Sequence, residues 1–255
     1  MRLLHLLFGV TGYAIFFGTF LYLIGFVTGL LAPVTVDVGG PIEPVWLALA
    51  IDAALISLFG VQHAIMARPW FKRWLTRVVP QPLERTVFVL ATCGVLALMF
   101  WQWRPIPNVL WSLDGAPAAL LRALCFTGWG IVLLSTFLID HFDLFGLRQV
   151  WLPFRGRPYV QRPFVERGLY RRMRHPLMFG MVLAFWAAPT MTLGHLAFAG
   201  FFSIYIAIGL RLEERDLVAQ HGESYLDYRR RVRSLLPLRR GRPAQPAAAL
   251  VADAG

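Results

Sequence analysis

The chain alternates long apolar runs with short polar segments, which is the pattern of a protein that crosses a membrane several times. A helix rises 1.5 Å per residue, so about 20 apolar residues cover the roughly 30 Å of hydrocarbon in a bilayer. Four runs are long enough for one crossing each, at residues 6–31, 45–66, 86–103 and 117–139.

The last apolar run, residues 177–210, is too long for a single crossing. The segment AAPTMTLG interrupts it with Pro189 and Gly194, and both residue types disfavour a continuous helix. We therefore expect a short helix over residues 177–188 and a longer one from about residue 193 that continues past the membrane. The predicted fold is all-α: a polytopic membrane helical bundle of about five to six transmembrane segments, the last two forming a helical hairpin.

The composition agrees with this pattern. Hydrophobic residues make up 57% of the 255 positions and the mean hydropathy is +0.58, which excludes an ordinary soluble domain. The N-terminal apolar run lacks an A-x-A-like cleavage site, so we expect a first spanning helix and not a removed signal peptide. Cys93 and Cys125 lie inside apolar runs, so we expect neither a disulfide framework nor a metal site.

The formal charge of +11 would suggest nucleic acid as a partner of a soluble chain, but the positive-inside rule explains it here. If the N-terminus is cytosolic and the chain crosses six times, only Arg104 and Arg122 of the 25 basic residues fall outside the cytosolic segments. Both termini are then cytosolic, and no nucleic-acid partner is expected. The cytosolic segments are residues 1–5, 67–85, 140–176 and 211–255.

The chain divides into three parts by composition. Residues 1–139 form the N-terminal transmembrane helices, and residues 140–237 hold the hairpin together with most of the charged segments. Residues 238–255, which are rich in Ala and Pro, predict a disordered tail.

The segment HGESYLDYRRRVRSLLP predicts a C-terminal amphipathic helix on the cytosolic side. Tyr225, Tyr228 and Val232 share one side of it, and the arginines form a basic cluster that suits anionic lipid headgroups. We expect this helix to lie on the membrane and to close a site at the base of the hairpin.

The strongest local signal for chemistry is the sequence Arg174-His175-Pro176 at the start of the hairpin. Proline is favoured at the first helical position, and the free amides of a helix start attract an anion. Arg174 adds a planar cation that suits a carboxylate. The alternative is a basic interfacial anchor with an ordinary helix start.

The other end of the hairpin carries two carboxylates. Glu213 lies on one helical stripe with Ile206, Leu210 and Leu217, and a carboxylate on an apolar stripe needs a cationic partner, which favours a ligand-binding role. For Glu214, three residues beyond Arg211, a simple ion pair with that arginine is the alternative to a ligand-binding role.

Further polar residues lie near the same face of the membrane. His63 is about 7 Å inside the cytosolic boundary, where an ionisable group is a functional candidate, although a helix-to-helix hydrogen bond shared with Gln62 explains it equally well. His141 and Asp143 follow the fourth span, and plain interfacial residues are their alternative interpretation. The chain contains no P-loop, H-E-x-x-H or G-x-S-x-G pattern, which argues against ATP-driven, zinc-protease and serine-hydrolase chemistry.

Residues 162–237 resemble the C-terminal half of the isoprenylcysteine carboxyl methyltransferase family, through G-L-Y-x-x-x-R-H-P-x-x-x-G, a helical hairpin, the pair EE and G-E-S-Y-L-D-Y-R-R-R-V. In that family this half binds S-adenosylmethionine at the cytosolic face. The resemblance implies cofactor contacts from Val165, Tyr170, His175, Pro176, Leu177, Met178 and Glu213.

Two departures from that family concern the substrate. Met178 stands where the family usually has tyrosine, and the substrate-contacting arginine of the family aligns with Gly209. Arg211 can take that role only by a shifted register. A prenylated or other lipid acceptor is therefore kept as an alternative substrate.

A longer stretch, including GYAIFFGTFLYLIGF, FGVQHAIMARPWFKRW, LERTVFVL, FWQWRPIP and DHFDLFGLRQVW, resembles the bacterial methanethiol S-methyltransferase family over nearly the whole chain. This resemblance implies methylation of a small thiol, giving dimethyl sulfide, in the bacterial inner membrane. The thiolate is the nucleophile in such a reaction, so a base is required. We hypothesise that His63, or His141 with Asp143, takes the proton while Arg174, Glu213 and the helix start hold the cofactor.

A non-enzyme reading also stays open. The chain resembles proteins linked to nitrogen-oxide respiration that act as non-catalytic accessories, and a bis-histidine haem carrier is a related option because His63 and His141 lie at similar depth.

Overall fold

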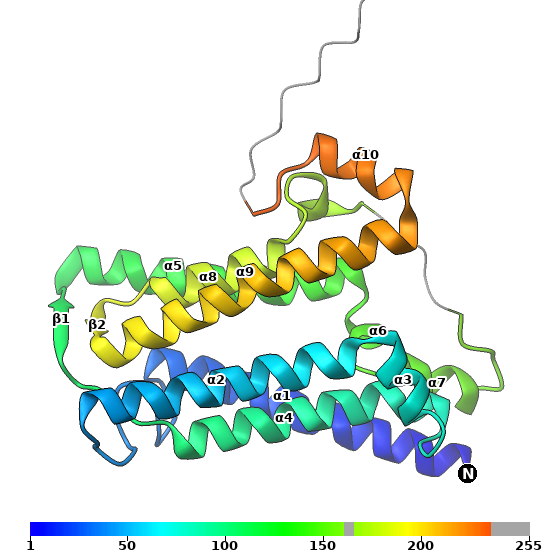
Figure 1. Cartoon of the computed structure of the whole chain (residues 1–255), viewed down its shortest axis with the longest axis horizontal. Helices are drawn as coiled ribbons and strands as arrows, with labels where there is room; N and C mark the ends of the chain where they lie inside the picture. The colour runs from blue at the N-terminus through cyan, green and yellow to red at the C-terminus, as the bar shows by residue number, and fades with distance from the viewer. Residues whose placement is uncertain (161–165, 236–255) are drawn as a thin grey trace, which may run out of the picture.

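Six apolar helices run side by side and alternate in direction in the computed structural model, which describes residues 1–160 and 166–235 (Figure 1). In these residues, five helices are long and apolar enough to cross a membrane, and α8 is shorter. This confirms the predicted membrane bundle. The six helices are α1 (Arg2–Thr28), α2 (Val45–Ala67), α4 (Glu84–Gln102), α5 (Gly115–Ile139), α8 (Pro176–Trp186) and α9 (Leu193–His221).

The predicted division of the last apolar run is also confirmed, because α8 ends at Trp186 and α9 begins at Leu193. The side chain of Thr192 accepts a hydrogen bond from the amide of His195 and caps the start of α9. Two predictions, the role of Val165 and the disordered tail over residues 238–255, lie outside the described residues.

Short elements gather at one end of the bundle, which we call the basic end: it holds the N-terminus, α3, α6, α7 and the C-terminal part of α9 (Figure 1). The predicted amphipathic helix is present as α10, with Tyr225 and Tyr228 buried. The other elements were not predicted, because they are too short to show a period. The short elements are α3 (Pro69–Leu75), η1 (Gln81–Leu83), α6 (His141–Leu144), α7 (Leu147–Phe154), η2 (Gly168–Arg171) and α10 (Glu223–Arg231).

The opposite end, which we call the strand end, carries a small antiparallel sheet that the sequence analysis missed. Strands β1 (Val109–Ser112) and β2 (Thr190–Thr192) pair there, with Val109 opposite Thr192. Both strands fall in loops rich in Pro and Gly, where no alternation of apolar and polar residues marks a strand.

The six helices form two layers, α1, α2 and α4 in one and α5, α8 and α9 in the other (Figure 1). Buried aromatic rings join the layers, and the ring of Phe26 on α1 lies 5.9 Å from that of Phe198 on α9.

Within the second layer, α5 and α8 approach so closely that a Cβ atom at Gly180 would lie 2.7 Å from the carbonyl oxygen of Gly128. Small residues permit this kind of approach between membrane helices. It explains the glycine that follows Arg174-His175-Pro176 at fixed spacing.

Candidate functional site

The hairpin of α8 and α9 brings its two charged ends together. Arg174, just before α8, donates from Nη2 to Oε1 of Glu214 on α9 at 2.5 Å and from Nε to the same oxygen at 2.9 Å. Both side chains are largely buried, at 6% and 14% exposed. The expected meeting of the two ends is therefore present in the structure.

Protein groups occupy the rest of the Arg174 guanidinium. Its Nη1 donates to the carbonyl oxygens of Arg229 at 3.0 Å and Val232 at 2.7 Å. Glu214 thus pairs with Arg174, and the simple ion pair of Glu214 with Arg211 is not the arrangement observed. Arg211 itself is exposed on α9.

His175 lies between the two glutamates of α9. Its Nε2 is 3.2 Å from Oε1 of Glu214, and its Nδ1 is 3.6 Å from Oε2 of Glu213. The imidazole is buried, whereas half of the Glu213 side chain is exposed. Glu213 is therefore the carboxylate of this cluster that can reach a ligand.

The first turn of α8 completes the cluster. Pro176 is its first residue, and Leu177 and Met178 follow it half-buried. The first amides of a helix have no partner inside the helix, and they carry a partial positive charge. A carboxylate or another anion is stabilised at this position.

The C-terminal segment grips the same place, a contact that the sequence did not reveal. The amides of Arg174 and His175 donate to the carbonyl oxygens of Arg233 at 2.9 Å and Ser234 at 3.0 Å. The hydroxyl of Tyr228 donates to the carbonyl oxygen of Tyr170 at 2.6 Å. We call α10 with residues 232–234 the C-terminal clasp.

Burial holds the clasp in place. Tyr225 and Tyr228 are each 1% exposed and pack on Leu217 and Val218 of α9. Burial, with a smaller contribution from the nearby Glu214 carboxylate, raises the pKa of Tyr225 to about 12. The predicted apolar side of this helix therefore packs on the protein itself.

His63 lies in an aromatic setting on α2. Its ring centroid is 5.6 Å from that of Phe59 and 4.9 Å from that of Phe88. Its Nδ1 is buried and has no hydrogen-bond partner among the described residues. Gln62 bonds instead to Met66 and Thr92, so His63 does not share its hydrogen bond.

Two contacts place His63 near the helix that carries the glutamates. The ring of Phe59 also lies 5.4 Å from that of Tyr205 on α9, about two turns before Glu213. One turn beyond His63, Arg68 forms a 2.8 Å ion pair with Asp216 of α9.

His141 and Asp143 do not form the expected pair. The Nε2 atom of His141 is 2.8 Å from the Tyr13 hydroxyl, and its Nδ1 is 2.8 Å from the Thr136 hydroxyl. Asp143 instead accepts from Arg148 and Tyr159 at 3.2 and 3.3 Å. The proposed proton acceptor formed by these two residues therefore has no support from the geometry.

The imidazole of His141 is a link between helices. Because Thr136 donates to the carbonyl oxygen of Leu133, it accepts from Nδ1 of His141, and Nε2 accepts from Tyr13. Burial lowers the pKa of His141, against the opposing effect of the Asp140 carboxylate. Both ring nitrogens are occupied, so the haem alternative that pairs His141 with His63 gains no support.

Comparison with known proteins adds information about the whole chain. A family model described as a protein of unknown function, DUF1295, matches residues 81–232. No solved structure gives a significant match. Within the described residues, no group of three or more His, Cys, Asp or Glu side chains could hold a metal ion.

Three similar proteins carry the same name. The chain is 48% identical to methanethiol S-methyltransferase 2 of Bradyrhizobium diazoefficiens, over 92% of this chain and 91% of that one. It is 48% identical to methanethiol S-methyltransferase of Mycobacterium tuberculosis, over 92% and 97% of the two chains. It is 45% identical to that of Crocosphaera subtropica, over 92% of each. The chain belongs to the methanethiol S-methyltransferase family.

Proposed function

We propose that this protein transfers a methyl group from S-adenosylmethionine to methanethiol, releasing dimethyl sulfide. The observation that carries the proposal is the 45–48% identity to three methanethiol S-methyltransferases over almost the full length of each chain. The cluster at the base of the hairpin supplies groups with the chemistry to hold such a methyl donor.

The residues at the start of α8 fit this cofactor. An amino-acid carboxylate suits the free amides of Leu177 and Met178, because a helix start stabilises an anion. The half-exposed Glu213 offers a carboxylate to hydroxyl or ammonium groups, and Tyr170 lies in η2, shortly before α8.

The buried pair of Arg174 and Glu214 has a positioning role in this proposal. Arg174 and Glu214 bond to each other, and Arg174 also bonds to the clasp. Together with the contact between Glu214 and His175, these bonds hold the start of α8 against α9. Arg211, exposed one turn before Glu214, remains a candidate contact for the substrate.

His63 is the proposed proton acceptor. When bound, S-adenosylmethionine supplies a methyl group on a positively charged sulfur, which leaves as a neutral thioether. The S–H proton of methanethiol passes to Nδ1 of His63, and the thiol sulfur then forms the new C–S bond. The rings of Phe59 and Phe88 suit a small sulfur compound, since sulfur contacts aromatic rings favourably.

The proposal places the basic end in the cytosol. Basic residues concentrate there, as the positive-inside rule requires of cytosolic loops, and the N-terminus lies at that end (Figure 1). Both termini are cytosolic in this proposal. In this arrangement residues 140–237 form the cofactor-binding half, at the cytosolic face of a bacterial inner membrane.

A direct test uses the purified protein in detergent or lipid nanodiscs. Methanethiol and S-adenosylmethionine are added in a sealed vial, and dimethyl sulfide in the headspace is measured by gas chromatography. We expect dimethyl sulfide to form only when both reactants are present. Glu213→Gln should lose at least about nine-tenths of this product, because losing a hydrogen bond to a charged group changes a rate about tenfold. Exposed Glu223 on α10 provides the control, Glu223→Gln.

A second vial contains a prenylated cysteine with a free carboxyl group in place of methanethiol. Methylation of that acceptor without dimethyl sulfide formation would overturn the thiol assignment and leave the methyl donor in place. No binding of S-adenosylmethionine in calorimetry would overturn the whole proposal.

A further inference from the structure

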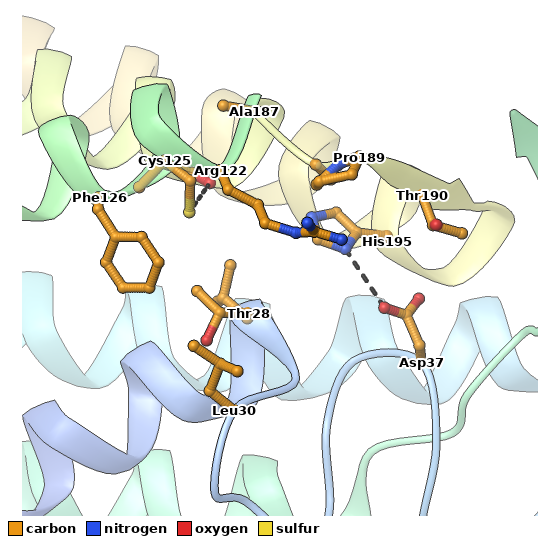
Figure 2. Close-up of a pocket in the computed structure, with 13 residues that line it drawn as sticks. Thr28, Leu30, Asp37, Arg122, Cys125, Phe126, Ala187, Pro189, Thr190 and His195 are labelled. Carbon is orange, nitrogen blue, oxygen red and sulfur yellow. Dashed lines mark hydrogen bonds and ion pairs between the residues drawn. The ribbon is translucent and has the colours of Figure 1, made fainter. Parts of the chain in front are cut away.

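A cavity lies at the strand end, far from the Arg174 cluster. It has a volume of about 210 Å³ and opens between the end of α1 and the second helix layer (Figure 2). Its apolar wall includes Val27, Leu30, Phe126 and Ala184. The proposed function uses none of these residues.

His195 and Asp37 form one polar wall of this cavity. The Nε2 atom of His195 is 2.9 Å from the carbonyl oxygen of Phe185, which can only accept, so Nε2 carries the proton. In its neutral form the ring has a lone pair on Nδ1, and this atom faces Oδ2 of Asp37 at 3.5 Å (Figure 2). Two acceptors facing each other need a hydrogen donor between them.

No residue in the described part of the chain gives Nδ1 of His195 a hydrogen bond, although the side chain is only 3% exposed. Asp37 cannot turn away, because its Oδ1 accepts from the Thr192 hydroxyl at 2.5 Å. A positively charged N–H donor that enters the cavity would satisfy both acceptors. A primary ammonium group has this chemistry.

Arg122 adds a positively charged side chain to the same cavity, so the cavity also suits an anionic group. Its side chain reaches from α5 across the opening (Figure 2). It is exposed and forms no ion pair within residues 1–160 and 166–235. A guanidinium in this setting suits a phosphate. The cavity is therefore complementary to a ligand that joins an ammonium to an anion.

The position of the cavity at the surface of the bundle indicates that this ligand is a membrane lipid. Arg122 lies seven residues after Gly115, the first residue of α5, or about 10 Å along the helix, and from this depth a long arginine side chain can extend to the lipid phosphates. Leu30 and Phe126 are exposed at the opening and offer an apolar surface for an acyl chain. A lipid reaches this site from the bilayer without crossing water.

We propose that this cavity binds a zwitterionic phospholipid of the phosphoethanolamine type. The ammonium group donates to Asp37 and His195, the phosphate contacts Arg122, and one acyl chain lies along Leu30 and Phe126. A trimethylated headgroup has no N–H to donate, and a glycerol headgroup has no cation. The site therefore discriminates among common phospholipids.

The test is native mass spectrometry of the full chain after exchange into an equal mixture of phosphatidylethanolamine, phosphatidylcholine and phosphatidylglycerol. We expect one phosphatidylethanolamine to be retained about tenfold over each of the others, the size of a charge-assisted hydrogen bond. Arg122→Ala and Asp37→Asn should both abolish this preference. Arg104→Ala, which removes the other basic residue of this end, should keep it.

Three outcomes would overturn the proposal: equal retention of the three lipids, an unchanged preference in Arg122→Ala, or displacement of the lipid by millimolar free phosphoethanolamine. The last would identify a soluble zwitterion as the ligand. Thermal unfolding of each variant confirms that it is folded, and the readout does not use methyl transfer.

Discussion

Arg174 and Glu214 form a buried ion pair across the base of the hairpin, with Nη2 of the arginine 2.5 Å from Oε1 of the glutamate. Along the chain, α8, β2 and most of α9 lie between these two residues. The same guanidinium bonds to two carbonyl oxygens of the C-terminal clasp. One side chain thus joins three segments of the chain at the proposed cofactor site.

Removing one member of this pair should destabilise the fold strongly. Glu214→Gln leaves the Arg174 charge buried without its counter-ion, and such losses lower the free energy of unfolding by about 3–5 kcal/mol. Denaturant unfolding in detergent measures the change. The exposed pair of Arg68 and Asp216 is the matched control, and Asp216→Asn should lower it by about 0–1 kcal/mol. Equal effects of the two variants would contradict the positioning role.

Glu213→Gln should act on binding and leave the fold intact, because half of this side chain is exposed. We expect the Kd for S-adenosylmethionine to rise about tenfold, the effect of losing one hydrogen bond to a charged group. Calorimetry measures the Kd, and an unchanged melting temperature shows that the fold is kept. A Kd equal to that of the unmodified protein would exclude Glu213 from the site.

His63→Gln should lower kcat by about 10²–10⁴ without changing the KM for S-adenosylmethionine, as expected for loss of a general base. Activity of the variant should recover as the pH rises, since the fraction of thiolate in solution grows about tenfold per pH unit below the thiol pKa. The control is His5→Gln, at the same end of the bundle. A pH-rate profile parallel to that of the unmodified protein would refute the assignment.

The stability of the fold should depend on His141 at acidic pH. Burial lowers the pKa of this imidazole in the folded protein, so below about pH 6.5 the unfolded chain takes up a proton that the folded chain resists. Stability therefore falls as the pH drops from 7 toward 5. His141→Gln should remove this part of the loss, and His5→Gln should keep it. Melting temperatures at pH 5, 6 and 7 give the comparison, and identical slopes would show that His141 does not contribute.

Gly180→Ala should separate α5 from α8. The added Cβ would lie 2.7 Å from the carbonyl oxygen of Gly128, and overpacking of this kind costs about 1–3 kcal/mol. Gly200 on α9 has nothing within 4 Å of such a Cβ, so Gly200→Ala should be neutral or slightly stabilising. Unfolding of both variants in detergent tests the contrast, and a neutral Gly180→Ala would show that the helices can shift apart.

Most of the helical architecture follows from hydropathy alone, because each span buries its polar backbone in a helix and shows a long apolar run. The division of the last run near Pro189 was predictable for the same reason. The pair of β1 and β2 was not, since its pairing joins segments about 80 positions apart and depends on how α5 and α9 are placed.

For the candidate site, the hairpin, whose two arms return to the same face of the membrane, predicted that its two charged ends meet. It did not predict which glutamate pairs with Arg174, because Glu213 and Glu214 are adjacent and their assignment depends on the rotation of α9. The hydrogen bonds of His141 to Tyr13 and Thr136 depend on packing between distant helices. Sequence proximity wrongly suggested Asp143 as its partner.

The short length of α8 has a consequence at the strand end. The 11 residues of α8 rise about 16 Å. The part of α9 from Leu193 to Glu213, which returns from the turn to the His175 contact, rises about 30 Å. The chain between Trp186 and Leu193 therefore descends through the remaining depth in extended form. Bare peptide groups at that depth are unfavourable in lipid, and partnering with β1 shields them. The little sheet is the substitute for the missing turns of helix.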